Sequence, residues 1–211
     1  MPYCKDLSLL FLHVPKTGGS SVEEYLKTKS SNVELLYPVY GNPILPEKEL
    51  QKISLQHQTY STIYKYRDVL GVDFEDPKLK IFTIVRNPYN RVLSAIMNKL
   101  ITWTDPPQKV YHVLKYFFLK KDFVMPDHMT LDNHNLPAYE FLIDETGELI
   151  PDLTIFHTET LTHDMHQYGF TDYVGKEHDT KYFHYLCPES IELINDYYHM
   201  DFELFGYPRL I

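Results

Sequence analysis

Short apolar runs recur along the chain, and each ends at turn-forming residues that lead into a segment with helical spacing. Residues 7–14 form a strongly apolar run that is interrupted by Ser8 and His13. The glycine-containing segment 15–19 follows, and residues 20–26 then begin with hydroxyl side chains ahead of glutamates, as helix starts do. This pattern predicts a buried strand, a loop and a helix in that order.

A second transition has the same shape. Residues 79–85 are rich in β-branched side chains and lead through the segment 86–88 into residues 89–100. The apolar residues of this last segment recur at the spacing of one helix face: Val92, Leu93, Ile96 and Leu100. A further strand, loop and helix are therefore expected.

A third transition runs from the apolar segment 153–157 into a helix at 159–168, with Gly169 as its stop. A last helix is expected after Pro188, continuing to about Tyr198. Strands that alternate with helices form parallel sheets covered on both faces. The sequence thus predicts an α/β fold with a central parallel sheet flanked by helices.

Composition places this fold in one soluble domain. The 211 residues favour a single domain over 1–211, because one core of this size already buries most of its apolar surface. With 44% hydrophobic and 23% charged residues, disordered, collagen-like and coiled-coil chains are excluded. Two proline-containing stretches, near 37–47 and 102–135, are expected to be excursions from the core on the substrate side.

The net charge and the cysteine content exclude further classes of protein. Twenty Lys and Arg against 29 Asp and Glu give a net charge of −9, the wrong sign for holding a nucleic acid. Cys4 and Cys187 have no CxxC spacing, which argues against a disulfide scaffold or a structural zinc site. No apolar run approaches the roughly 20 residues of a membrane helix. We expect a cytoplasmic protein with no signal peptide and no membrane partner.

A small anion remains compatible with this charge if a pocket concentrates cations and backbone amides. At the first strand-to-helix turn, Gly18 and Gly19 allow backbone N–H groups to converge, the helix adds its positive end, and Lys16 adds a mobile cation. The lysine precedes the glycines, so the loop does not match the Walker A pattern. The alternative is an ordinary tight turn with a capping serine.

The second turn carries similar chemistry. Arg86 is expected where a strand ends, and Ser94 lies two helical turns later, so the two side chains can hold a second phosphate. Arg91 is a weaker candidate for the same task. Taken alone, Arg86 could be a surface ion-pair residue and Ser94 a small helix-packing residue.

The segments 13–21 (HVPKTGGSS) and 85–95 (VRNPYNRVLSA) together resemble the two signatures of sulfotransferases that use 3′-phosphoadenosine-5′-phosphosulfate (PAPS), especially the carbohydrate sulfotransferase branch. Residues 201–207 are also similar to the usual ending of that family. The resemblance implies a three-layer, P-loop-like fold and assigns Arg86 and Ser94 to the 3′-phosphate. It assigns the 5′-phosphosulfate to Lys16, Thr17, Gly18, Gly19, Ser20 and Ser21.

Sulfuryl transfer needs a base for the acceptor proton and positive charge on the leaving oxygen, but it demands no metal. Histidine suits the first task, because its unperturbed pKa of about 6.5 lets it accept a proton near neutrality. The segment 56–60 (QHQTY) resembles the family segment with the catalytic base, which makes His57 the candidate base. Lys16 can bind the phosphosulfate and also stabilise the leaving oxygen.

Other polar residues are weaker candidates for binding a metal, the acceptor or the nucleotide. His163 and His166 have a spacing that can chelate a metal on a helix, but a solvated face is the simpler interpretation and no metal site is expected. The second excursion contains residues that could hold a polar acceptor or could lie in a solvated loop: Asp127, His128, Asp132 and His134. Lys176 and Lys181 lie where the family often closes a basic, polar loop over the nucleotide, but this sequence departs from the family there, and they are not included in the predicted site.

The sequence therefore predicts a sulfotransferase that moves the sulfuryl group of PAPS to a hydroxyl, with a carbohydrate as the favoured acceptor and PAP as the product. One alternative is a P-loop phosphotransferase, although the chain lacks GK[ST] and an evident acidic Mg²⁺ ligand. The other is a noncatalytic protein that binds a nucleotide or a glycan. No oligomeric state follows from these patterns.

Overall fold

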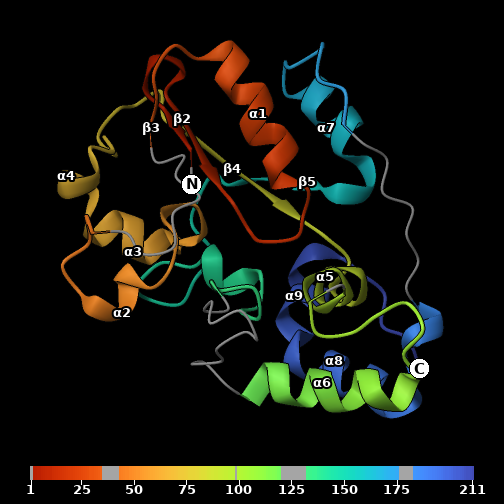
Figure 1. Ribbon diagram of the computed structural model, residues 1–211. Coiled ribbons are helices and arrows are strands. Elements are labelled where there is room, and N and C mark those ends of the chain that lie inside the picture. Colours follow the sequence, from red (N-terminus) through yellow and green to blue (C-terminus); the bar gives the residue numbers. More distant parts are fainter. Residues whose placement is uncertain (1, 35–42, 98, 120–131, 176–182) are drawn as a thin grey trace.

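A five-stranded sheet forms the centre of the fold, with the strand order β3-β1-β2-β4-β5 (Figure 1). The computed structural model describes residues 2–34, 43–97, 99–119, 132–175 and 183–211. The strands are β1 (Tyr3–Cys4), β2 (Leu9–Leu12), β3 (Val33–Glu34), β4 (Lys80–Val85) and β5 (Thr154–His157). Strands β2, β4 and β5 are parallel, whereas β1 pairs antiparallel with both β2 and β3.

The parallel strands are those that the sequence predicts, so the α/β fold with a parallel sheet is confirmed. Leu12 pairs with Thr83, and Val85 pairs with His157. The three strands therefore end at one edge of the sheet, and the segments that follow them meet there. The antiparallel edge was not predicted, because strands of two residues are too short to show a period.

Helices cover both faces of the sheet, as expected for three layers (Figure 1). The side chains of β2 alternate between the two faces. Leu9 and Phe11 join a core cluster with α1 (Gly19–Lys29) and α7 (Leu161–Gln167). Leu10 and Leu12 join another, with α3 (Tyr60–Lys65) and α4 (Arg67–Leu70). Both faces of β2 are thus buried, as its nearly continuous apolar sequence requires.

A third core cluster consists of helices and lies beyond the carboxyl ends of the strands (Figure 1). Its helices are α5 (Pro88–Ile96), α6 (Pro107–Leu119), α8 (Pro188–Tyr197) and α9 (His199–Phe205). Asn87 caps α5, because its side chain accepts the N–H groups of Tyr89 and Asn90, and Pro88 occupies the first turn. This local sequence starts α5 directly after β4.

Two helix boundaries differ from the prediction. Helix α5 ends at Ile96 rather than near Leu100, because Met97 has an extended backbone. The predicted helix 159–168 begins as the 3₁₀ helix η4 (Thr158–Thr160) and continues as α7. The remaining short helices are α2 (Lys48–Gln51), η1 (Lys5–Leu7), η2 (Leu55–His57), η3 (Tyr139–Phe141) and η5 (Phe183–Tyr185).

The described residues include only parts of the two predicted excursions, 37–47 and 102–135. Residues 37–42 and 120–131 lie outside the described residues, and with them Asp127 and His128. Helix α6 accounts for much of the second excursion and packs against α8. Among the described helices, none combines the length and the apolar character that crossing a bilayer would require.

Candidate active site at the carboxyl ends of the strands

The loop between β2 and α1 has the backbone of an anion cradle. Lys16 and Gly18 both have left-handed conformations, with φ values of 69° and 90°. Gly18 occupies the N-cap position of α1 without a side-chain hydrogen bond, so the helix presents its positive end unscreened. A Cβ on Gly19 would lie 2.3 Å from the His13 ring, so only glycine fits there.

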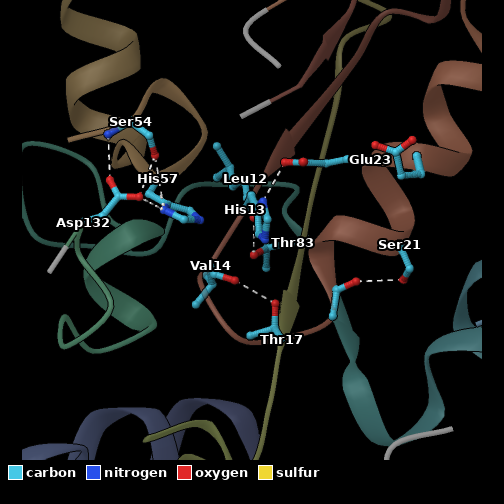
Figure 2. Close-up of polar contacts among 12 residues, drawn as sticks. Leu12, His13, Val14, Thr17, Ser21, Glu23, Ser54, His57, Thr83 and Asp132 are labelled. Atoms are coloured by element: carbon cyan, nitrogen blue, oxygen red, sulfur yellow. Dashed lines mark hydrogen bonds and ion pairs between the residues drawn. The ribbon is translucent and has the colours of Figure 1, made fainter. Parts of the chain in front are cut away.

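The hydroxyl groups of this loop shape the turn. Thr17 is fully buried, and its Oγ1 donates to the carbonyl of Val14 over 2.8 Å (Figure 2). Ser21 Oγ donates to the carbonyl of Gly18 over 2.8 Å and lies 2.8 Å from the hydroxyl of Tyr173. Ser20 is exposed at the start of α1. Of the three hydroxyl groups, that of Ser20 is therefore the most open to a ligand.

The charges of two other cations act on Lys16 beside this loop. Burial lowers the pKa of Lys16, and the positive charges of Lys99 and Arg86 lower it further. Arg86 is buried, and its Nη1 donates to the carbonyl of Lys16 over 3.2 Å. Such mutual repulsion is relieved when an anion binds between the charges. Lys99 follows α5 and lies outside the segment 85–95, so no motif in the sequence points to it.

Arg91 and Ser94 both lie on α5 but differ in burial. Arg91 is buried, whereas Ser94 is half-buried. The Arg91 side chain is 1% exposed and donates to the carbonyls of Pro15 and Leu136 over 3.1 and 2.7 Å. Its Nη1 lies 3.7 Å from the buried carboxylate of Asp201. Arg91 thus fixes the backbone of the cradle instead of presenting its charge to a ligand.

The residues after β5 join the other two strand ends. Thr158 Oγ1 lies within hydrogen-bond distance of the carbonyls of Thr17 (2.7 Å) and Val85 (3.0 Å). Glu159 accepts the N–H of Asn87 and the hydroxyl of Tyr207, each over 2.9 Å. These contacts tie the first loop, the start of α5 and the C-terminal segment together. No motif in the sequence marks Thr158 or Glu159 as site residues, because their partners are distant in the chain.

His57 lies in η2 and is 5% exposed. Its Nδ1 is 2.6 Å from Oδ2 of Asp132, which also accepts the Ser54 hydroxyl over 2.9 Å (Figure 2). Burial acts to raise the pKa of Asp132, but the hydrogen bond and charge of His57 and the Ser54 donors outweigh it and hold that pKa below its ordinary value. Asp132 is therefore a buried carboxylate in contact with the candidate base.

A second buried imidazole–carboxylate pair faces the first. His13 Nδ1 lies 2.6 Å from Oε1 of Glu23, and the rings of His13 and His57 meet edge-on at 5.1 Å (Figure 2). Burial lowers the pKa of His13 to about 4 although Glu23 acts to raise it, so the ring is neutral at neutral pH. The His134 ring is also 5.1 Å from that of His57.

One cluster among the described residues has the composition of a metal site. The ligand atoms of His57, Asp132 and His134 all lie within 4.8 Å of one another. The 2.6 Å between His57 and Asp132 is a hydrogen-bond distance, and a proton shared between them accounts for it. In the part of the chain that the structure describes, His163 and His166 belong to no such cluster. Lys176 and Lys181 lie outside the described residues.

Comparison with known proteins agrees with this arrangement. A family model described as a sulfotransferase family matches residues 2–124 and 122–208. The matched residues contain the cradle, the Arg86 turn, both buried pairs and the C-terminal helices. Searches of curated proteins and of solved structures give no significant match.

Proposed function

Because the chain belongs to the sulfotransferase family, we propose that its sulfuryl donor is PAPS and that its acceptor is a hydroxyl group of a carbohydrate. The observation that carries the donor assignment is the hydrogen bond that holds Arg86 against the Lys16 backbone beside the open N-terminus of α1, with the charge of Lys99 also acting on Lys16. A nucleotide with phosphate groups at both its 5′ and 3′ positions matches a site with two separate cationic turns.

In this proposal the loop after β2 binds the 5′-phosphosulfate, and the start of α5 binds the 3′-phosphate. The residues of the loop are Lys16, Thr17, Gly18, Gly19, Ser20 and Ser21. Arg86 supplies the charge for the 3′-phosphate and Ser94 a hydroxyl donor. The hydrogen bond from Arg86 to the Lys16 carbonyl supports this division, because it holds the two turns side by side.

His57 is the proposed general base. Its Nδ1 faces Asp132, so Nε2 is the atom that takes the acceptor proton. The acceptor oxygen forms a bond to sulfur as the bond from sulfur to the bridging phosphate oxygen breaks. The proton moves to His57, and PAP leaves with the negative charge that Lys16 stabilises. No metal takes part in this sequence, and we expect the same turnover in the presence of EDTA.

The preference for a carbohydrate follows the resemblance of residues 13–21 and 85–95 to the carbohydrate sulfotransferase branch. A cavity beside α3 offers groups that sugars bind, although its lining contains neither His57 nor Lys16. The cavity has a volume of about 740 Å³, and its lining includes Tyr60, Tyr64, Asp144 and Glu145. Tyrosine rings stack on sugar rings, and carboxylates accept hydrogen bonds from sugar hydroxyls. This combination suits a polar acceptor better than a hydrophobic alcohol.

Incubation with ³⁵S-labelled PAPS and a panel of glycans, phenols and aliphatic alcohols tests the proposal. We expect labelled product from a glycan and far less of it with the His57→Ala variant under the same conditions. Transfer to a phenol alone would contradict the choice of acceptor. Absence of transfer from PAPS to every acceptor, together with no PAP binding, would contradict the donor assignment.

A further inference from the structure

We propose that Asp132 is a positioning residue that holds His57 in a single tautomer, with the proton on Nδ1 and the lone pair on Nε2. This inference rests on the proposed role of His57 as the base. It adds to the reaction a carboxylate whose sequence context is equally consistent with holding an acceptor or lying in a solvated loop. Asp132 touches His57 and acts through it.

The hydrogen bonds of Asp132 determine the tautomer. Its Oδ1 accepts the N–H of Ser54 over 2.7 Å, and its Oδ2 accepts the Ser54 hydroxyl and faces His57 Nδ1. An ionised carboxylate can only accept hydrogen bonds, so Nδ1 must be the donor in this contact. A neutral imidazole carries one ring proton, which leaves Nε2 unprotonated and able to accept the acceptor proton.

The backbone around Asp132 holds both ends of His57. Asp132 and Asn133 have left-handed conformations, with φ values of 49° and 60°. In this turn the Asn133 side chain donates to the His57 carbonyl over 2.9 Å while Asp132 holds the ring. Non-glycine residues retain such conformations only where surrounding contacts compensate their cost. The turn therefore places the backbone and the ring of His57 at the same time.

The surroundings also favour a charged His57 after proton transfer. Asp132 lies against the ring and is 5% exposed, so its negative charge acts in a site with little water. The neighbouring His13 is neutral at neutral pH, because burial lowers its pKa to about 4. The imidazolium that forms on His57 thus meets a carboxylate on one side and an uncharged ring on another, an arrangement that stabilises the product of the proton step.

The first experiment compares Asp132→Asn with His57→Ala and with the double variant. We expect Asp132→Asn to lower kcat by roughly 10²–10⁴-fold with PAP affinity unchanged, because the amide favours the wrong tautomer. The double variant should be no slower than His57→Ala alone, because residues that act as one unit are not additive. A purely structural Asp132 would instead lower activity further in the double variant.

The second experiment measures the tautomer of His57 directly and needs no activity assay. With ¹⁵N-labelled histidine, NMR should show His57 of the wild-type protein protonated at Nδ1 and unprotonated at Nε2, and Asp132→Asn should change this pattern. Glu23→Gln is the matched control, because it makes the same change of carboxylate to amide in the neighbouring pair and should leave the His57 tautomer as it is.

The outcomes separate the two hypotheses. If His57→Ala abolishes transfer while Asp132→Asn keeps wild-type turnover, the positioning role is wrong and the base assignment stands. If His57→Ala keeps wild-type turnover, both assignments are wrong. Should Asp132→Asn fail to fold, the wild-type spectrum still decides, because a proton on Nε2 in place of Nδ1 overturns the inference.

Discussion

Single residues in this site have separable tasks. Lys16 lies in the cradle with its charge near those of Arg86 and Lys99, whereas His57 is held by Asp132 on a different segment. In the proposed function, the first group acts on the anionic donor and the second on the acceptor proton. Variants of each should therefore change different kinetic constants.

His57→Ala and Lys16→Ala test this separation. Loss of His57 should lower kcat by roughly 10²–10⁴-fold and leave PAP affinity near the wild-type value. Loss of Lys16 should weaken PAP binding and also slow transfer, because the same ammonium contacts the donor before and during the reaction. Steady-state kinetics with calorimetry of PAP binding measure both effects. An unchanged PAP affinity in Lys16→Ala would remove Lys16 from the donor site.

PAP should bind more tightly than AMP, because only PAP has a 3′-phosphate for Arg86 and Ser94. A charge-assisted phosphate contact contributes about 1.5–3 kcal/mol, which corresponds to a tenfold to hundredfold difference in Kd. Arg86→Ala should bring the affinity for PAP close to that for AMP, and an unchanged AMP affinity in this variant would show that the cradle is intact. Equal calorimetric affinities of the wild-type protein for PAP and AMP would contradict the assignment of the second turn.

At the scale of elements, the start of α1 depends on how closely the helix approaches β2. The His13 ring, directly after β2, lies against Gly19 in the first turn of α1, and Glu23 one turn later holds that ring in place. The helix therefore reaches its position only because residue 19 has no side chain. The same approach directs the N-terminus of α1 into the site.

Gly19→Ala should force this contact apart, since the added Cβ would lie 2.3 Å from the His13 ring. Overpacking of this kind costs about 1–3 kcal/mol in the free energy of unfolding, and the shifted helix should also bind PAP less tightly. Ser20→Ala is the matched control for stability, because Ser20 is exposed. Urea denaturation measures both variants, and wild-type stability in Gly19→Ala would show that the helix and strand are not in close contact.

At the scale of the whole molecule, the candidate site lies where three parallel strands end. Ligand sites in α/β sheets lie at the carboxyl ends of strands, because successive loops converge there. This convergence also buries titratable groups such as His13, and so links the stability of the whole fold to pH.

Because the pKa of His13 is about 4 in the folded protein, its burial makes the fold less stable as the pH falls. As the pH falls below about 6.5, the unfolded chain takes up a proton at His13 whereas the folded protein does not until the pH nears its lower value. The buried neutral His13 therefore gives its full contribution to the free energy of unfolding above this pH window. That contribution, on the order of 3 kcal/mol, is lost as the pH falls through the window. Urea denaturation at pH 7 and pH 5 should therefore show a smaller pH dependence in His13→Gln. An equal pH dependence in both proteins would contradict the buried neutral state.

The sequence by itself determined the features that depend on neighbours in the chain. The three parallel strands followed from apolar runs, and a helix after the segment 86–88 followed from the spacing of apolar residues. The interpretation of Gly18 and Gly19 as part of an anion-binding loop followed from their place between a predicted strand and a predicted helix. These features are readable because capping, turn conformation and side-chain period act over a few residues.

Only the tertiary structure decided what distant segments bring to the site. Asp132 meets His57 across 75 positions of sequence, and Arg91 meets the carbonyl of Pro15 across 76. The pattern of α5 indicated that residues 92, 93 and 96 face a core but did not indicate that the Arg91 side chain would be buried. The physical reason is that partnership across such distances depends on how the layers pack. Packing can turn a loop carboxylate into the partner of a histidine, and a candidate ligand-binding arginine into a support for the backbone.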